Sequence, residues 1–424
     1  MIGSTTARSV TSGGIFILSQ AASLSASGNL GLSNAKKAKQ DEFYTQYVDI
    51  QKEVEAYLEF DADSFRGKVV YCNCDDPFES NFFKYFAANF NKLGLKKLVT
   101  TSYDGSPIAG AQLTFGEYNE GNGKRQKPKA IAVEIEEVKD VNGDGATGIE
   151  DVKLFLKQNP HTRTRLEGGG DFRSAECVEL LKQADVVVTN PPFSLFKEYI
   201  AQLVEHGKKF LIIGNVQALT YKEIFPLVKA DKLWMGVTIH SGDREFRVPD
   251  HYPLNAAGCR VDENGVKYIR VKGVRWYTNL DHGRRHKELP LMTMEDNLRF
   301  SKHKEIQGKA AYDRYENYDA IEVPFTGAIP SDYSGVMGVP ISFLDKYNPD
   351  QFEIVGTLES SDPDNPYRIR WYSAQDQKDA FFRRFGEPGS IPLNMSGVIN
   401  DVKVFKRILI RHRRRTRPTR GTKK

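Results

Sequence analysis

Short apolar runs alternate with amphipathic segments through the first half of the chain. A turn containing Gly, Asp or Asn follows most of these runs, a pattern typical of buried strands. The segments between them place large apolar residues three or four positions apart, which predicts helices with one covered face. The predicted strands are residues 69–72, 97–101, 130–138, 184–188 and 209–213. The predicted helices include residues 50–58, 82–93 and 196–204, and Gly94 is predicted to end the second.

Strands separated by helices of this length predict a parallel α/β sheet covered by helices on both faces. After about residue 235 the sequence becomes rich in strands, turns and aromatic residues. We interpret this part as a second region grafted onto the sheet, with a soft boundary because strands of the sheet can continue into it. The predicted divisions are a flexible extension over 1–34, a sheet domain over 35–235, a second region over 236–410 and a basic tail over 411–424.

The composition is that of a folded protein outside the membrane. With 424 residues, 40% of them hydrophobic and 27% charged, the chain can bury a large core, which excludes wholesale disorder. Its four cysteines form no Cys-x-x-Cys pair, so neither a disulfide framework nor a zinc site is expected, and a reducing cytoplasm fits. No apolar run approaches the roughly 18–20 residues that cross a bilayer, so no membrane partner is expected.

The basic residues are concentrated at one end of the chain. Eleven of the 60 lysines and arginines lie between Lys403 and Lys424, where no acidic residue occurs, so the rest of the chain holds 49 basic and 55 acidic residues. Such a tail can gain affinity for a polyphosphate by releasing counterions, without reading its sequence. A solvated, disordered end is the alternative interpretation.

The most informative stretch is 184–193, where a buried strand leads into Asn-Pro-Pro-Phe. Prolines have a fixed φ, so they hold an Asn amide and a carbonyl rigidly at the carboxyl edge of the sheet, where open α/β sheets bind ligands. An exocyclic amine suits this arrangement, because the Asn190 side-chain oxygen and a carbonyl can accept its two N–H groups while its lone pair stays available. Phe193 offers a stacking face. A plain Pro-Pro turn explains the prolines but neither Asn190 nor Phe193.

This motif resembles the hallmark of S-adenosylmethionine-dependent amino methyltransferases of DNA, in which Asn, Asp or Ser precedes Pro-Pro and an aromatic residue after the fourth strand. The resemblance implies that Asn190, Pro191, Pro192 and Phe193 are the catalytic residues. The carbonyl that accepts the second amine hydrogen is assigned to Pro191 by analogy with the family. The cofactor implied by the resemblance is S-adenosylmethionine.

Two segments before this motif resemble the cofactor-binding motifs of the same family. Phe43, Tyr44 and Thr45 match its aromatic-Thr motif, which packs against the cofactor. Residues 69–77 look like its first strand and cofactor loop, although Cys-Asn-Cys-Asp-Asp-Pro replaces the usual Gly-rich turn. A carboxylate near the cationic amine and sulfonium is favourable, and either Asp75 or Asp76 could supply it. A helix N-cap role for these residues is the alternative.

Two further resemblances concern the ribose and the adenine of the cofactor. Asp104, just past the second strand, lies where the family often places an acid for the ribose hydroxyls, although a surface turn is the alternative. Gly168-Gly169-Gly170 precedes Asp171 and Phe172, which resemble the Asp-Phe pair that contacts adenine. The resemblance assigns Asp171 to the adenine amino group and Phe172 to the face of the ring.

A closer resemblance is to the EcoRI-type adenine methyltransferases, and it runs from about Ala35 to Arg411. The stretches that carry it are 35–46, 72–77 with 81–83, 276–282 and 335–347. It implies a Rossmann-like methyltransferase sheet with helices on both faces and a strand-rich C-terminal target-recognition region. In this interpretation residues 35–235 form the S-adenosylmethionine-dependent catalytic domain, and 236–410 hold the remaining core strands and the recognition region.

The implied activity is site-specific methylation of adenine N6 in double-stranded DNA, for restriction-modification or epigenetic marking, with a cognate restriction endonuclease as a further partner. The enzyme must extrude the base, because a stacked adenine hides its amino group. Direct in-line transfer then needs no covalent enzyme intermediate. The alternatives are an RNA or protein-amide methyltransferase, or a catalytically idle DNA-binding relative. The absence of Gly-x-Gly-x-x-Gly argues against a nicotinamide dehydrogenase.

Two charged segments remain outside this scheme. Residues 140–151 space oxygen ligands as a calcium loop does, but Thr147 and Asp151 depart from the pattern, so a turn with a helix N-cap is the alternative and no catalytic metal is expected. His282, His286 and His303 lack metal-ligand spacing. Asp281-His282 is interpreted as a surface or DNA-facing pair. Nearby basic residues are candidates for phosphate contacts, with a solvated charged face as the alternative: Arg244, Arg247, Arg284 and Arg285.

Overall fold

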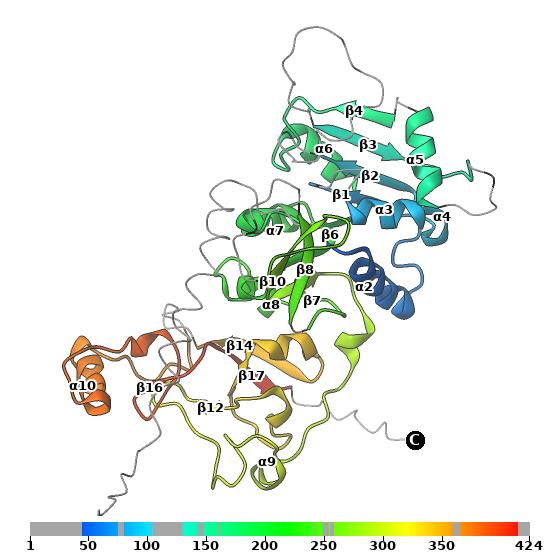
Figure 1. The fold of residues 1–424 in the computed structure, drawn as a ribbon. Helices are drawn as coiled ribbons and strands as arrows, with labels where there is room; N and C mark the ends of the chain where they lie inside the picture. Colours follow the sequence, from blue (N-terminus) through cyan, green and yellow to red (C-terminus); the bar gives the residue numbers. More distant parts are fainter. Residues whose placement is uncertain are drawn as a thin grey trace, which may run out of the picture.

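The computed structural model describes residues 45–74, 80–102, 104, 130–141, 143, 148–159, 162–240, 242–248, 254, 258–358 and 365–413. Its main feature is a mixed sheet in the upper and middle parts of Figure 1, with the strand order β4-β3-β2-β1-β5-β6-β11-β7. The strands are β1 (Val69–Cys72), β2 (Lys97–Thr101), β3 (Ile131–Ile135), β4 (Arg163–Arg165), β5 (Val186–Thr189), β6 (Lys209–Asn215), β7 (Trp234–Met235) and β11 (Val274–Thr278).

The central strands of this sheet are parallel, as the sequence predicts. β1 pairs in parallel with β2 and β5, and β5 pairs in parallel with β6. The prediction of a wholly parallel sheet is wrong at the flanks, because β3 is antiparallel to β2 and β11 is antiparallel to β6. An apolar run predicts a strand but not its direction, and large sheets commonly carry antiparallel strands outside a parallel centre.

Helices cover both faces of the sheet. Alternate residues of a strand point to opposite faces, so each central strand contributes side chains to two cores. Val70 and Cys72 face a core shared with α2 (Tyr47–Phe60), α3 (Asn81–Ala88) and α5 (Ile149–Gln158). Val69 and Tyr71 face a second core shared with α6 (Ala175–Gln183) and α7 (Phe196–Glu205). The predicted covering of both faces is therefore confirmed for the described residues.

The helix predicted over 82–93 is two helices, α3 and α4 (Phe90–Leu93), which meet at Asn89. The Asn89 side-chain amide donates a hydrogen bond to the Tyr85 carbonyl at 2.9 Å, a local bond that competes with the helical ladder. Gly94 ends α4 with a φ of 63°, as predicted.

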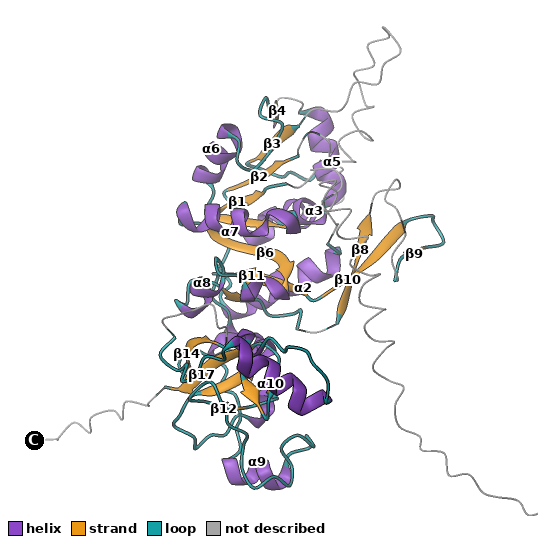
Figure 2. Ribbon diagram, turned by 90° about the vertical axis from the view of Figure 1, so that its left-hand side faces the viewer, coloured by secondary structure: helices purple, strands orange, loops and turns teal. Residues whose placement is uncertain are grey.

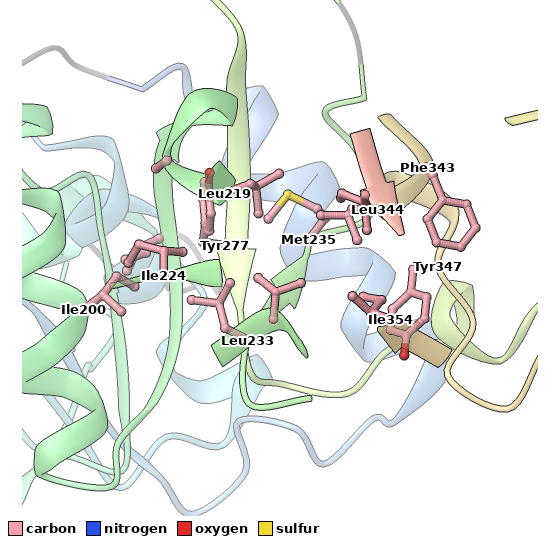
Figure 3. Close-up of a cluster of buried hydrophobic side chains, with 14 of the residues drawn as sticks. Ile200, Leu219, Ile224, Leu233, Met235, Tyr277, Phe343, Leu344, Tyr347 and Ile354 are labelled. Carbon is pink, nitrogen blue, oxygen red and sulfur yellow. The ribbon is translucent and has the colours of Figure 1, made fainter. Parts of the chain in front are cut away.

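A smaller sheet packs beside the large one, toward the C-terminus. It has the order β12-β13-β17-β14, with β12 (Ile321–Glu322), β13 (Met337–Pro340), β17 (Arg407–His412) and β14 (Phe352–Thr357). Figure 3 shows the buried side chains that join it to the large sheet, where Leu233, Met235 and Tyr277 lie toward Leu344 and Ile354. Both sheets therefore share one apolar core. β17 also includes Arg411 and His412, so the first residues of the predicted tail belong to a strand.

Three more strands, β8 (Asp243–Val248), β10 (Lys267–Lys272) and β9 (Arg260–Val261), are inserted between β7 and β11. They form an antiparallel sheet in the order β8-β10-β9, which extends from the large sheet at the right of Figure 2. We call these three strands the ribbon.

The remaining described elements are α8 (Phe225–Lys229), α9 (Met294–Phe300), α10 (Ala374–Phe385), β15 (Val398–Ile399), β16 (Val402–Lys403) and the 3-10 helices η2 (Phe193–Leu195), η3 (Val216–Thr220), η4 (Gly283–His286), η5 (Thr326–Ala328), η6 (Ile341–Lys346) and η7 (Leu393–Met395). None of the described helices has the length and apolar character that a membrane span requires.

Candidate active site

The Asn-Pro-Pro-Phe motif lies at the carboxyl end of β5, where the sequence places it. Asn190 follows the strand directly and is 8% exposed. The Pro192 carbonyl accepts a hydrogen bond from the Leu195 amide at 3.0 Å and so begins η2. None of the described residues donates a hydrogen bond to the Pro191 carbonyl. Phe193 is half-buried and packs against the core on the α2 and α3 side of the sheet.

A buried hydrogen-bond network joins the ends of three parallel strands beside this motif. Asn73, which follows β1, is 1% exposed. Its side-chain oxygen accepts from the Thr101 hydroxyl at 3.0 Å and from the Cys74 amide at 2.8 Å. The Thr189 hydroxyl donates to the Asn73 main-chain carbonyl, and the Tyr71 hydroxyl lies 3.0 Å from Thr101 Oγ1. Paired polar groups of this kind fix the relative positions of the strand ends.

Sequence reasoning missed Asn73, Thr101 and Thr189 as residues that shape the site. The available signal was that each follows or ends a buried apolar strand, at the edge where ligands bind. A polar residue at such a position needs a partner when it is buried, and neighbouring parallel strands supply one another's partners.

The structure brings Asp104 and the glycine turn together, although Gly168 comes 64 positions after Asp104 in the chain. The Asp104 amide donates to the Gly169 carbonyl at 2.8 Å, and the Asp104 carboxylate accepts from the Ala130 amide at 2.5 Å. Gly169 and Gly170 have φ values of 67° and 71°, a region that favours glycine. A Cβ on Gly169 would lie 3.5 Å from Asp104 Oδ2. Glycine therefore suits these positions both because φ is positive and because Gly169 lies close to the Asp104 side chain.

The two residues after the glycine turn face different surroundings. Asp171 forms a two-pronged ion pair with Arg173, whose Nε and terminal nitrogen lie 2.9 and 2.7 Å from the two carboxylate oxygens. Asp171 and Glu198 hold the pKa of the Arg173 guanidinium above its usual range. Phe172 is 2% exposed, and its ring packs edge-on against Tyr199 at a centroid distance of 5.0 Å. Their contacts with a cofactor remain predictions.

Thr45 is the described member of the aromatic-Thr motif, and Phe43 and Tyr44 lie outside the described residues. Thr45 is 4% exposed, and its carbonyl accepts a hydrogen bond from the Asn81 side chain at 2.8 Å, which ties it to the start of α3. The buried Thr45 hydroxyl has no hydrogen-bond partner among the described residues. A buried hydroxyl normally has one, so the described residues alone do not satisfy Thr45.

The two candidate acids of the first loop, Asp75 and Asp76, also lie outside the described residues. The alternative that one of them caps the next helix is wrong, because Ser80 caps α3. The Ser80 hydroxyl accepts hydrogen bonds from the amides of Phe82 at 3.1 Å and Phe83 at 3.4 Å. Ser80 stands directly before the helix, which is the position from which a side chain reaches these amides.

The interpretation of His282 as a surface or DNA-facing residue is wrong. His282 is 2% exposed, and its Nε2 lies 2.9 Å from the Met235 carbonyl, to which it donates. Burial lowers the pKa of His282 to about 4, with a further contribution from the neighbouring Arg285. A neutral imidazole therefore fixes the loop after β11 to β7.

The arginines beside it are also largely enclosed by the protein. Arg285 has an 8% exposed side chain, pairs with Asp231 at 2.6 Å and lies 3.5 Å over the ring of Trp234. Arg284 donates to the Val237 carbonyl at 2.9 Å. Sequence reasoning missed these contacts because Asp231, Trp234 and Val237 lie about fifty positions earlier in the chain.

The predicted calcium loop is described only in part, because Asn142 and residues 144–147 lie outside the described residues. Asp151 is 1% exposed and accepts hydrogen bonds from the amides of Val141 and Gly148, each at 2.8 Å. These bonds belong to the turn and helix-capping alternative. Within the described part of the chain, no group of three or more His, Cys, Asp or Glu side chains could hold a metal.

An α/β sheet with Asn-Pro-Pro-Phe at its carboxyl edge, and with a glycine-rich Asp-Phe turn earlier in the chain, is the arrangement that the resemblance predicts for an amino methyltransferase. The chain belongs to the family described as adenine-specific methyltransferase EcoRI, whose sequence model matches residues 31–413. It is therefore an enzyme of the adenine-specific methyltransferase class.

Individual relatives show the same relationship over most of their length. The chain is 46% identical over 330 residues to the Type II methyltransferase M.EcoRI of Escherichia coli, covering 76% of this chain and 88% of the relative. It is 36% identical over 341 residues to M.MpnI of Mycoplasma pneumoniae, covering 79% and 86%. It is 37% identical over 337 residues to M.MgeORF184P of Mycoplasma genitalium, covering 79% and 87%. No solved structure matches the chain.

Proposed function

We propose that this protein methylates the N6 amine of adenine at specific sites in double-stranded DNA, with S-adenosylmethionine as the methyl donor. Membership of the adenine-specific methyltransferase family supports the reaction and the base. The observation that carries the proposal is the position of Asn190 and the Pro191 carbonyl at the carboxyl end of β5, next to the network that fixes three strand ends. The antiparallel β11 beside β6 and the helices on both faces support a Rossmann-like methyltransferase fold.

The described residues fit a cofactor of this kind. The buried Thr45 hydroxyl has no described partner, and Asp104 lies against a glycine turn that leaves space beside its carboxylate. When bound, S-adenosylmethionine supplies a methyl group on a sulfonium, which is electrophilic without help from a metal. The residues proposed to hold it are Phe43, Tyr44, Thr45, Asp75 or Asp76, Asp104, Asp171 and Phe172.

The chain's own residues would position the target amine. The Asn190 side-chain oxygen and the Pro191 carbonyl would each accept one N–H of the adenine amine and leave its lone pair directed away from the protein backbone. Phe193 would stack on the extruded base and offset part of the few kcal/mol that extrusion costs. Pro191 and Pro192 keep these acceptors in place, so the enzyme accelerates the reaction by orientation and by polar groups that are already organised.

The remaining parts of the chain have proposed roles in the same reaction. The region over 236–410 would recognise the target site, and residues 414–424 of the basic tail would add sequence-independent affinity for phosphates. The names of the relatives, which are Type II methyltransferases, support a role in restriction-modification with a cognate endonuclease as partner. A cytoplasmic location remains the prediction from cysteine usage.

Sequencing of DNA from cells that express this protein tests the proposal directly. Single-molecule sequencing should detect N6-methyladenine in one short sequence context, and the modification should be absent from cells that express Asn190→Ala. Methyl groups found only in RNA or in protein amides would support the other methyltransferase assignments instead. The absence of methyl transfer to DNA, RNA and protein alike would support a catalytically idle DNA-binding relative.

A further inference from the structure

The ribbon has one apolar face and one charged face. In its central pair of strands, Phe246 lies opposite Ile269, and both are buried in the core shared with α2. Side chains alternate along a strand, so the residues between them occupy the other face, which we call the outer face. Its members are Asp243, Glu245, Arg247, Arg260, Tyr268, Arg270 and Lys272.

The outer face is basic and carries one aromatic ring. Arg260 binds Glu245 with two hydrogen bonds of 2.8 and 2.6 Å, which offsets the charge of that carboxylate. The Arg260 guanidinium also lies 4.2 Å over the ring of Tyr268. Arg270 and Lys272 are exposed and have no ion pair with any described residue. Arg247 is exposed on the same face, directly opposite Tyr268.

The ribbon stands on the same edge of the large sheet as the active site. Val274, the first residue of β11, pairs with Asn215 at the carboxyl end of β6. The Asn215 side chain donates to the Lys272 carbonyl at 3.0 Å, so the base of the ribbon is fixed at this edge. β5, the strand that Asn190 follows, is the next one beyond β6. Two strand spacings place Asn190 about 10 Å to the side of β11.

A duplex fits this surface in charge and in size. The six-residue strands β8 and β10 are about 20 Å long. An antiparallel pair of strands can enter or border the major groove of B-DNA, which is about 12 Å wide. Exposed arginine and lysine side chains are the usual contacts to DNA phosphates. The apolar face is already covered by the protein's own core, so of the two faces of the described strands the outer one is left for a partner.

We propose that the outer face of the ribbon binds the phosphate backbone of duplex DNA beside the extruded adenine, through Arg247, Arg270 and Lys272. This inference rests on the proposed function for its substrate and adds the surface that holds the duplex. It replaces the sequence-based assignment of phosphate contacts to Arg284 and Arg285, which are mostly enclosed by the protein.

The test compares two double variants of the full-length protein. Arg270→Ala/Lys272→Ala removes two exposed charges from the outer face. Lys92→Ala/Lys96→Ala removes two exposed charges from the opposite, amino edge of the sheet and serves as the matched control. Fluorescence anisotropy measures the Kd of each protein for a mixed-sequence DNA duplex over a range of salt concentrations, and calorimetry measures the Kd for S-adenosylmethionine.

The outer-face variant should bind the duplex at least about tenfold more weakly at 0.1 M salt, because each phosphate contact contributes about 0.9 to the slope of log K against log salt. The slope should become shallower by about 2, while the cofactor Kd of this variant and the duplex Kd of the control variant stay at the wild-type values. An unchanged duplex Kd, or a weaker Kd with an unchanged salt slope, would overturn the assignment to phosphates. The measurement needs no turnover, so failure of methyl transfer in the wild-type protein would refute the proposed function separately.

Discussion

The Thr101 hydroxyl donates a hydrogen bond of 3.0 Å to the side-chain oxygen of Asn73 and so joins the end of β2 to the end of β1. Because this uses the only hydrogen of the Thr101 hydroxyl, the Tyr71 hydroxyl is the donor in its 3.0 Å contact with Thr101. Thr189 connects the same Asn73 to the end of β5, one residue before Asn190. The position of Asn190, the proposed amine-binding residue, therefore depends on a polar network that joins the ends of three strands.

Asn73→Ala should destabilise the fold and also weaken the site. The substitution leaves the Thr101 hydroxyl and the Cys74 amide without their acceptor, and buried donors of this kind cost about 1–3 kcal/mol each. We expect the free energy of unfolding to fall by about 2–4 kcal/mol in urea titrations.

The control for this variant is Asn264→Ala, which alters an exposed turn of the ribbon and should change stability by less than about 0.5 kcal/mol. Equal stability of the two variants would show that the network does not hold the strand ends.

Gly169→Ala should weaken cofactor binding more than it weakens the fold. Gly169 has a φ of 67°, which costs an alanine roughly 1–2 kcal/mol, and the new Cβ would lie in van der Waals contact with the Asp104 carboxylate and fill the space beside it. Gly67→Ala is the matched control, because Gly67 has a φ of 69° but open space around its Cβ. Both variants should lose similar stability, and only Gly169→Ala should raise the Kd for S-adenosylmethionine in calorimetry. A similar rise in both would remove Asp104 from the cofactor site.

The buried His282 predicts a loss of stability in mild acid. Its pKa is lowered to about 4 in the folded protein, against an ordinary value near 6.5, so the unfolded chain binds the proton first as the pH falls. The contribution of His282 to stability is complete above pH 6.5 and is lost toward pH 4. Between pH 7 and pH 5 this loss amounts to about 2 kcal/mol.

Substitution of this histidine isolates its share of the acid sensitivity. His282→Gln should be less stable at pH 7, yet its free energy of unfolding should fall by about 2 kcal/mol less than that of the wild-type protein between pH 7 and pH 5. His240, whose pKa burial and Arg284 also lower to about 4, should retain its own contribution in this variant. Parallel pH profiles for the variant and the wild-type protein would contradict the neutral, buried state of His282.

The sequence was most informative where burial is continuous. β1 and β2 begin and end at the predicted residues, because their apolar runs are bounded by turns and lie inside the sheet. β4 was missed because Arg163–Arg165 is polar and mostly exposed, so the pairing with β3 that forms this flanking strand leaves no apolar pattern. The break at Asn89 was missed because the apolar spacing continues through it.

The position of Asn190 could be predicted, because a continuous apolar run leads directly into two prolines and so marks the end of a buried strand. Its role toward an exocyclic amine stays a prediction. The environment of Arg285 could not be predicted, because its partners Asp231 and Trp234 approach it only in the folded chain. The proximity of Asp104 to the glycine turn likewise depends on strand order, which the sequence pattern leaves open.

The measurement that tests the central claim most directly is methyl transfer by Asn190→Ala, with radiolabelled S-adenosylmethionine and duplex DNA under single-turnover conditions. Loss of one preorganised acceptor should slow transfer at least about 10²–10³-fold, while the Kd for the cofactor changes by less than about threefold. Transfer at a rate close to that of the wild-type protein would contradict the assignment of the amine-binding role to Asn190.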